Sequence, residues 1–125
     1  MANALNCRVH TVARLKNGMK VKVVWNDLLR LEIVKTGIHN ARNVELLSNL
    51  LAFGMIFFDI GAHVGQYSLI ASRIVGGHWE VHSFGPDPET FQCLTDNIAM
   101  NGLTNVRPNR VALSDQDGTK TFYLS

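Results

Sequence analysis

The chain has 125 residues, of which 46% are hydrophobic and 18% are charged, with a formal net charge of +2. This length suits one domain with a packed core, and the composition excludes an intrinsically disordered chain. The lysines and arginines are scattered, which argues against the clustered basic surface of a nucleic-acid-binding protein. No apolar run reaches the ~18 residues of a membrane span, and the first residues contain no apolar signal core.

The cysteines and histidines do not form metal-binding patterns. Cys7 and Cys93 stand far apart, which is typical of reduced thiols in the core of a cytosolic protein. Five histidines occur without ligand spacing: His10, His39, His63, His78 and His82. We therefore expect a cytoplasmic protein without a metal site.

The first predicted element is a β-hairpin over residues 7–25. Apolar and polar residues alternate on both sides of Asn17-Gly18. An Asn-Gly pair between such runs is a strong hairpin signal, and a two-residue turn requires positive φ at both positions. We expect both residues to adopt it.

Two helices are predicted next, over residues 26–37 and 43–54. The first begins at a capping Asn or Asp and ends at Gly37. The second places Val44, Leu47 and Leu51 on one face. We expect residues 1–54 to form an N-terminal appendage of hairpin and helices.

From residue 55 onward the pattern is strand, helix, strand, helix, strand. The apolar run "MIFFDIG" indicates a parallel strand covered on both faces. A helix is expected over 65–77, with its inward face formed by Leu69, Ile70, Ile74 and Val75. A second helix is expected over 87–102, with Asp87 as its cap and one face formed by Phe91, Leu94 and Ile98. Strands are expected over 79–85 and 105–115. Because Pro108 limits the last strand, its ladder is placed around Val111–Leu113, and Asp117-Gly118 turns the chain into a final β segment.

This order predicts an α/β fold, with a Rossmann-like parallel sheet and right-handed, doubly wound connections over residues 55–125. Ligands of such sheets bind beyond the carboxyl ends of the strands. The loop Gly61–Gly65 lies at such an end and leads into a helix. We expect the bend to leave main-chain amides available to a ligand, with Asp59 either fixing the loop or binding an ammonium group. A glycine-rich turn without a ligand remains the alternative.

The loop selects among nucleotide ligands. A dinucleotide fingerprint has a second glycine where His63 stands, and no Gly-Lys-Ser/Thr of a P-loop follows. An acid followed by glycines four apart therefore favours a ligand without a pyrophosphate, such as S-adenosylmethionine.

Three ordered blocks carry a family resemblance: "FFDIGAHVGQYSL", "VHSFGPDPETFQCLTDNIAMNGL" and "VALSDQDGT". Together with "VKTGIHN", they resemble the FkbM family of S-adenosylmethionine-dependent methyltransferases over roughly residues 30–125. The resemblance implies a class I methyltransferase fold and O-methyl transfer to a small molecule or sugar. It also implies the cofactor-binding residues Asp59, Gly61, Ala62, His63, Gly65, Phe84, Gly85, Pro86, Asp87, Val111 and Ala112.

The chain departs from the family pattern in two places. The second-strand motif usually reads Phe-Glu-Pro, and here it reads Phe84-Gly85-Pro86. The family usually has a glutamate where Asn40 stands. The missing acid at Gly85 predicts weakened cofactor affinity, because it would accept hydrogen bonds from the ribose hydroxyls.

The resembled fold has about seven strands, whereas only three parallel strands are predicted here. We therefore expect a fragment, the cofactor-binding half of a methyltransferase, with the first strand at an uncovered sheet edge. Self-association through that edge is a further expectation. No catalytic base is evident. His63 fits a structural or cofactor-contact role or a solvent-facing position, and Tyr67 fits either cofactor contact or packing. A vestigial binding protein is the alternative to an active enzyme.

Overall fold

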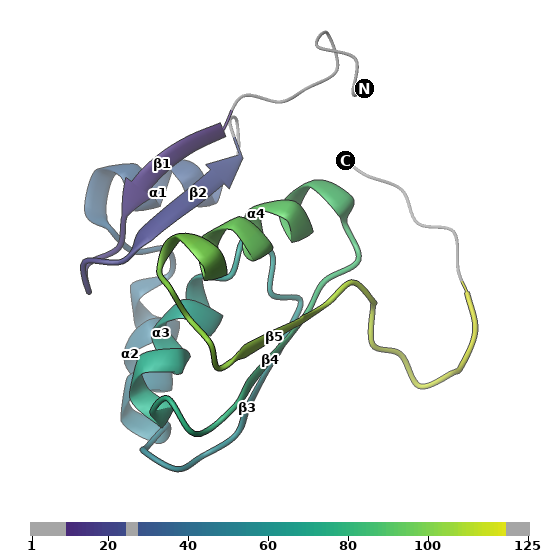
Figure 1. Cartoon of the computed structure of the whole chain (residues 1–125). Helices are drawn as coiled ribbons and strands as arrows, with labels where there is room; N and C mark the ends of the chain where they lie inside the picture. The colour runs from purple at the N-terminus through teal and green to yellow at the C-terminus, as the bar shows by residue number, and fades with distance from the viewer. Residues whose placement is uncertain (1–9, 25–27, 120–125) are drawn as a thin grey trace, which may run out of the picture.

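The computed structural model describes residues 10–24 and 28–119. Over these two ranges the chain forms a two-stranded hairpin, four helices and a three-stranded sheet (Figure 1). In chain order the elements are β1 (His10–Arg14), β2 (Lys20–Val24), α1 (Leu28–Thr36), α2 (Ala41–Leu50), β3 (Phe57–Ile60), α3 (Gln66–Val75), β4 (Val81–Phe84), α4 (Pro88–Met100) and β5 (Val106–Asn109). The larger sheet has the order β3-β4-β5 and both pairings are parallel, which confirms the predicted α/β fold.

The predicted hairpin is confirmed, but its turn is longer than two residues. Leu15 N–H donates to the Met19 carbonyl at 2.8 Å, and Gly18 N–H donates to the Leu15 carbonyl at 2.9 Å. Gly18 has a φ of 88°, whereas Asn17 is not in the positive-φ region. The prediction of positive φ at both positions is therefore wrong, because a longer loop needs only one left-handed residue.

The hairpin shares a hydrophobic core with the later helices. Met19, Val21 and Val23 are buried together with Leu69 of α3 and Cys93 of α4. Burial raises the pKa of the Cys93 thiol to about 11, so it stays protonated at neutral pH. The hairpin is thus packed against the sheet-forming part, while the division of the chain at residue 54 stays a prediction.

The N-terminal helices differ from their predicted bounds. α1 lies within the predicted range 26–37 and is followed by Gly37, but its predicted cap falls at residues 26–27, outside the described ranges. α2 covers 41–50 instead of 43–54, because Leu51 already has an extended backbone with a ψ of 139°. Of the predicted inner face, Val44 is buried and Leu47 is half-buried.

The helices of the sheet-forming part follow the prediction more closely. α3 ends at Val75 and Gly76 follows as its C-cap, as predicted, although Ile70 and Ile74 are only half-buried. α4 begins at Pro88, and the Asp87 carboxylate accepts the Glu89 N–H at 3.0 Å as the predicted cap. Both helices pack on the same face of the sheet (Figure 1).

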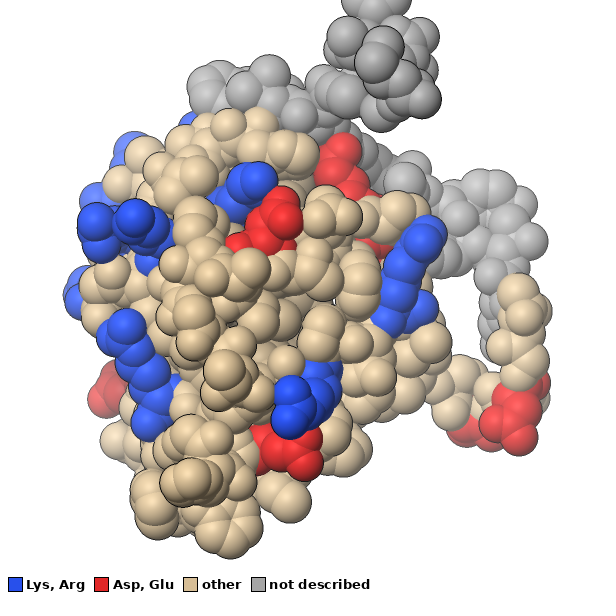
Figure 2. Space-filling model, in the orientation of Figure 1, with Lys and Arg blue, Asp and Glu red and all other residues tan. Residues whose placement is uncertain are grey.

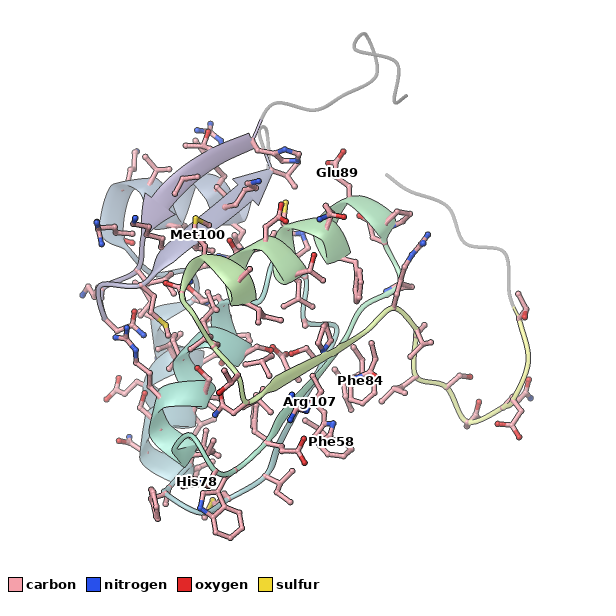
Figure 3. All side chains as sticks on the ribbon, in the orientation of Figure 1. Phe58, His78, Phe84, Glu89, Met100 and Arg107 are labelled. Atoms are coloured by element: carbon pink, nitrogen blue, oxygen red, sulfur yellow. The ribbon has the colours of Figure 1, made fainter. Side chains whose placement is uncertain are left out.

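The other face of the sheet is uncovered by the described helices. Phe58 and Ile60 of β3 are 56% and 64% exposed. Phe58 and Phe84 point away from the helices (Figure 3), with ring centroids 5.6 Å apart. The predictions that β3 is covered on both faces and that the sheet is doubly wound are therefore wrong for the described residues.

The last strand also lies earlier than predicted. β5 covers Val106–Asn109, and nothing in 111–119 is strand. The N–H groups of Val81 and Gly85 donate to the carbonyls of Asn105 and Asn109. Main-chain groups of successive strand residues point to opposite sides, so the missing N–H of Pro108 lies on the side of β5 that faces away from β4. The remainder of the predicted final β segment, 120–125, lies outside the described residues.

On the face shown in Figure 2, several Lys and Arg side chains lie near one another along the left edge, and others lie beside Asp or Glu. Within the described ranges, every helix is too short or too polar to cross a bilayer.

Candidate functional site

The glycine loop joins β3 to α3 and contains three left-handed residues. Gly61, His63 and Gly65 have φ angles of 75°, 55° and 99°. Gly61 N–H and Ala62 N–H both donate to the Phe84 carbonyl at 2.9 Å, and Gly65 N–H donates to the Ala62 carbonyl at 2.9 Å. The prediction that the bend leaves its amides available is therefore wrong for these three, because the loop uses them to anchor itself.

The two glycines have different reasons to be glycine. A Cβ at Gly61 would meet no atom within 4 Å, so the space in front of the loop is open. The left-handed φ is what favours glycine at this position. A Cβ at Gly65 would lie 2.6 Å from Leu94 Cδ1. Gly65 thus allows α4 to pack closely against the loop, which is a structural role.

His63 occupies a backbone conformation that is uncommon for a residue with a side chain. Its φ of 55° lies in the left-handed region, which costs roughly 1–2 kcal/mol for most L-residues. The sequence placed His63 where a dinucleotide loop has a glycine, and the backbone there is indeed glycine-like. Strain of this kind is concentrated at binding and catalytic sites, and His63 lines the pocket beside the loop.

The pocket in front of the loop has a volume of about 350 Å³, within the usual range for small-molecule sites. It combines the glycine loop and the start of α3 with two residues of the N-terminal segment. Its lining residues are Leu29, His39, Gly61, Ala62, His63, Gln66 and Tyr67. Three of the predicted site residues are therefore brought together here, namely Gly61, Ala62 and His63.

Asp59 lies behind the loop and is not part of the pocket lining. Its buried carboxylate accepts the Ser68 hydroxyl at 2.6 Å, and that hydroxyl also contacts the Ser83 hydroxyl of β4. Burial raises the pKa of Asp59, and hydrogen bonds from Ser68 offset part of the rise. The carboxylate therefore ties β3 to the first turn of α3, below the glycine loop.

The second-strand motif lies directly beside the loop. The Phe84 carbonyl accepts the two loop amides described above, and Gly85 is buried. A Cβ at Gly85 would lie 3.9 Å from the backbone nitrogen of His63, which is an ordinary van der Waals contact. Pro86 is half-buried, and Asp87 caps α4.

Val111 and Ala112 lie beyond the end of β5. Val111 is exposed, and its N–H donates to the Asn109 carbonyl at 2.9 Å. Neither residue belongs to the pocket lining. Their predicted position beside an adenine ring stays a prediction.

The pocket residue His39 belongs to the segment 37–40, which sequence reasoning recognised only in part. The segment "VKTGIHN" was singled out, but His39 and its partner Gln66 were not predicted as site residues. Asn40 has a φ of 57°, and its N–H donates to Glu32 Oε2 at 3.3 Å. The left-handed φ marks Asn40 as a turn residue, a role that asparagine tolerates well.

Asn97 of α4 and Asn101, which caps the C-terminal end of that helix, join it to the hairpin, a structural role that sequence reasoning missed. Asn97 Oδ1 accepts the Lys22 N–H at 2.6 Å, and its Nδ2 donates to the carbonyls of Lys22 and Val64 at 3.1 and 2.8 Å. Asn101 makes the equivalent pair with Lys20. The spacing of four residues, which places both side chains on one helix face, was the available signal in the sequence.

No group of three His, Cys, Asp or Glu side chains in the described part of the chain lies close enough to hold a metal ion. The site is therefore built from main-chain groups, two histidines, an amide and aromatic or apolar side chains. These features suit an organic ligand that is oriented by a few polar contacts.

The fold and loop define a class of protein. Parallel strands joined by helices, with a glycine loop at the carboxyl end of the first strand, form the class I methyltransferase fold, and solved structures of that class resemble the chain. The Methyltransferase FkbM domain matches residues 59–125, which is more than half of the chain. The chain belongs to this family.

The solved structures show similarity at the level of fold. TYW2 of P. horikoshii, in complex with MeSAdo, has a TM-score of 0.65 and 22% identity over 90% of this chain and 39% of its own. Trm5b of Pyrococcus abyssi has a TM-score of 0.59 and 23% identity, with 79% of this chain and 27% of Trm5b covered. An S-adenosylmethionine-dependent O-methyltransferase of Thermotoga maritima has a TM-score of 0.54 and 20% identity, with 80% of this chain and 40% of that protein covered. The chain thus spans well under half the length of these proteins, and no curated protein matches it.

Proposed function

We propose that the chain binds S-adenosylmethionine in the pocket in front of the Gly61–Gly65 loop and acts in methyl transfer. The observation that carries the proposal is the pocket itself, which lies at the carboxyl end of β3 in a chain of the FkbM family. The open space before Gly61 allows a ligand to approach the backbone closely. The complex of TYW2 with MeSAdo supports an adenosyl compound as the ligand of this fold.

The bound compound would supply an electrophilic methyl group for in-line transfer to a nucleophile. The contribution of this chain is to bind and orient, through the loop that Phe84 anchors and through the side chains of His39, His63 and Tyr67. Holding two reactants in line lowers a barrier by several kcal/mol. We assign no proton transfer to these residues.

For the acceptor, we propose the hydroxyl of a small molecule or sugar. The FkbM resemblance favours this class, and the Thermotoga maritima protein with a similar fold is an O-methyltransferase.

A second candidate function is binding without turnover, which the glycine at position 85 favours. A buried glycine stands where the family pattern has an acid, and it offers no side chain to the ribose. A domain that has lost this contact would retain the fold with weaker cofactor binding. The two functions differ in affinity and activity but share the same pocket.

The test is a comparison of melting temperatures in the presence of S-adenosylhomocysteine and of NAD. A ligand that binds the folded chain raises the melting temperature by mass action. We expect a rise with S-adenosylhomocysteine alone. A rise with NAD alone would overturn the proposal, and no rise with either compound would contradict cofactor binding in both candidate functions.

A further inference from the structure

Gln66 is a buried amide that joins the start of α3 to the N-terminal segment. It is only 3% exposed. Its Oε1 accepts the His39 N–H at 2.7 Å, and its Nε2 donates to the His39 carbonyl at 2.8 Å. The side chain thus pairs with both main-chain groups of one residue, 27 positions away in the sequence.

The partner of Gln66 lies in a tight turn that we call the 37–40 turn. Gly37 and Asn40 are left-handed at its two ends, with φ angles of 75° and 57°. Glu32 Oε1 contacts His39 Nδ1 at 3.0 Å, and the Gly37 carbonyl accepts the Lys16 N–H at 2.8 Å. The turn is therefore held to α1 and to the hairpin, and Gln66 adds its bond to α3.

Both partners line the pocket that the glycine loop opens onto. His39 comes from the 37–40 turn, while Gly61, Ala62 and His63 come from the loop on the other side. Gln66 directly follows that loop. His39 is the residue of the turn that lines the pocket, and the two hydrogen bonds of the Gln66 amide join it directly to the start of α3.

We propose that Gln66 is a positioning residue that fixes the 37–40 turn as one wall of the adenosyl-compound pocket. This inference rests on the proposed function, because the pocket is the one assigned to S-adenosylmethionine. A wall held in place before binding avoids the entropic cost of ordering it around the ligand. Loss of the amide leaves the wall free to move, and affinity falls.

Asn101 provides a matched control with the same chemistry at another place. Its Oδ1 accepts the Lys20 N–H at 2.9 Å, and its Nδ2 donates to the Lys20 carbonyl at 2.7 Å. It joins α4 to the hairpin and is absent from the pocket lining. Converting either amide to a carboxylate replaces one donor by an acceptor that repels the facing carbonyl.

The experiment compares Gln66→Glu and Asn101→Asp in the full chain. The dissociation constant for S-adenosylhomocysteine is measured by calorimetry well below the melting temperature of each variant. Amide hydrogen exchange in residues 37–40 is measured in parallel. We expect both variants to melt earlier, but only Gln66→Glu to bind about tenfold or more weakly and to exchange faster in the 37–40 turn.

Unchanged affinity together with unchanged exchange in Gln66→Glu would overturn the inference, as would an equal loss of affinity in Asn101→Asp. If the unaltered chain does not bind S-adenosylhomocysteine, the proposed function fails, and exchange decides the role of Gln66 by itself. Faster amide exchange in Gln66→Glu that is confined to the 37–40 turn then supports the positioning role of Gln66, and unchanged exchange refutes that role. Gln66→Met, which removes both hydrogen bonds without introducing a charge, replaces Gln66→Glu should that variant fail to fold.

Discussion

Asp59 shows how one buried acid links the site to the stability of the fold. Its carboxylate lies at the end of β3, bonded to Ser68, in surroundings that raise its pKa above the ordinary value of 3.8. Between 3.8 and the raised pKa, the folded chain binds more protons than the unfolded chain. The free energy of unfolding therefore decreases as pH rises through this window, and the full contribution of protonated Asp59 to it is present only below the window.

Asp59→Asn removes this titration, since the amide stays neutral at every pH. We expect the stability of the unaltered chain, relative to Asp59→Asn, to fall as pH rises from below 3.8 through the window. Urea unfolding of both proteins across this range measures the difference. A difference that stays constant with pH would show that Asp59 does not titrate in this way.

Gly85 stands where the FkbM resemblance predicts a glutamate. The site accepts a side chain, because the Cβ would rest 3.9 Å from the His63 backbone nitrogen and no positive φ is required. We expect Gly85→Glu to tighten binding of S-adenosylmethionine about tenfold or more, since charged hydrogen bonds contribute roughly 1.5–3 kcal/mol each. Calorimetry measures this, with Gly85→Gln as the uncharged control, which should gain less. Equal dissociation constants for Gly85→Glu and the unaltered chain would refute it.

At the scale of elements, local signals predicted most of the fold. Gly76 and Asp87 mark real helix ends, and the alternation around Gly18 marks a real hairpin. β5 was misplaced because Pro108 was judged without knowing that the strand is an edge, where a missing N–H costs no ladder bond. Whether both faces of a strand are covered also depends on the rest of the sheet and its helices. The apolar sequence of β3 therefore could not reveal that one of its faces is exposed.

Contacts between distant elements account for what the sequence could not predict about the site. The glycine loop is contiguous, and its residues were found from their spacing. His39 and Gln66 meet across 27 positions, and Asn97 meets Lys22 across 75. Amide side chains bond to any main chain that comes near, so their partners are set only by the folded arrangement.

Asn97 and Asn101 replace a neighbouring strand along the edge of β2. Their amides bond both main-chain groups of Lys22 and Lys20, two alternate residues of that strand. The fully buried Asn97 also bonds the Val64 carbonyl of the glycine loop. The hairpin is therefore joined to α4 by polar contacts at its edge as well as by the shared core.

We expect Asn97→Ala to destabilise the fold by about 2–4 kcal/mol, because it removes the partner of the buried Val64 carbonyl and of the half-buried main-chain groups of Lys22. Asn101→Ala is the control. Its contacts with Lys20 are exposed to water, so its loss should cost only about 1 kcal/mol. Chemical denaturation measures both changes. Equal costs for the two variants would contradict the special role given to burial at Asn97.

At the scale of the whole molecule, the two edges of the larger sheet differ. β5 carries Arg107 and Pro108, which are features that discourage pairing with another strand. β3 pairs with β4 on one side, and no described strand pairs with its other side. Its exposed side chains, Phe58 and Ile60, are both apolar. Unpaired main-chain groups beside an apolar surface favour association between chains.

We therefore expect the chain to self-associate through β3, and Ile60→Lys to weaken this association by placing a charge on the exposed side of the strand. Sedimentation velocity over a range of concentrations measures the change. Val12→Lys is the matched control, since Val12 is 53% exposed on β1, a strand of the hairpin, away from β3. Both substitutions add the same charge, so a general effect on solubility would act equally on the two. A chain that sediments as a monomer at all concentrations, or equal effects of the two lysines, would contradict association through this edge.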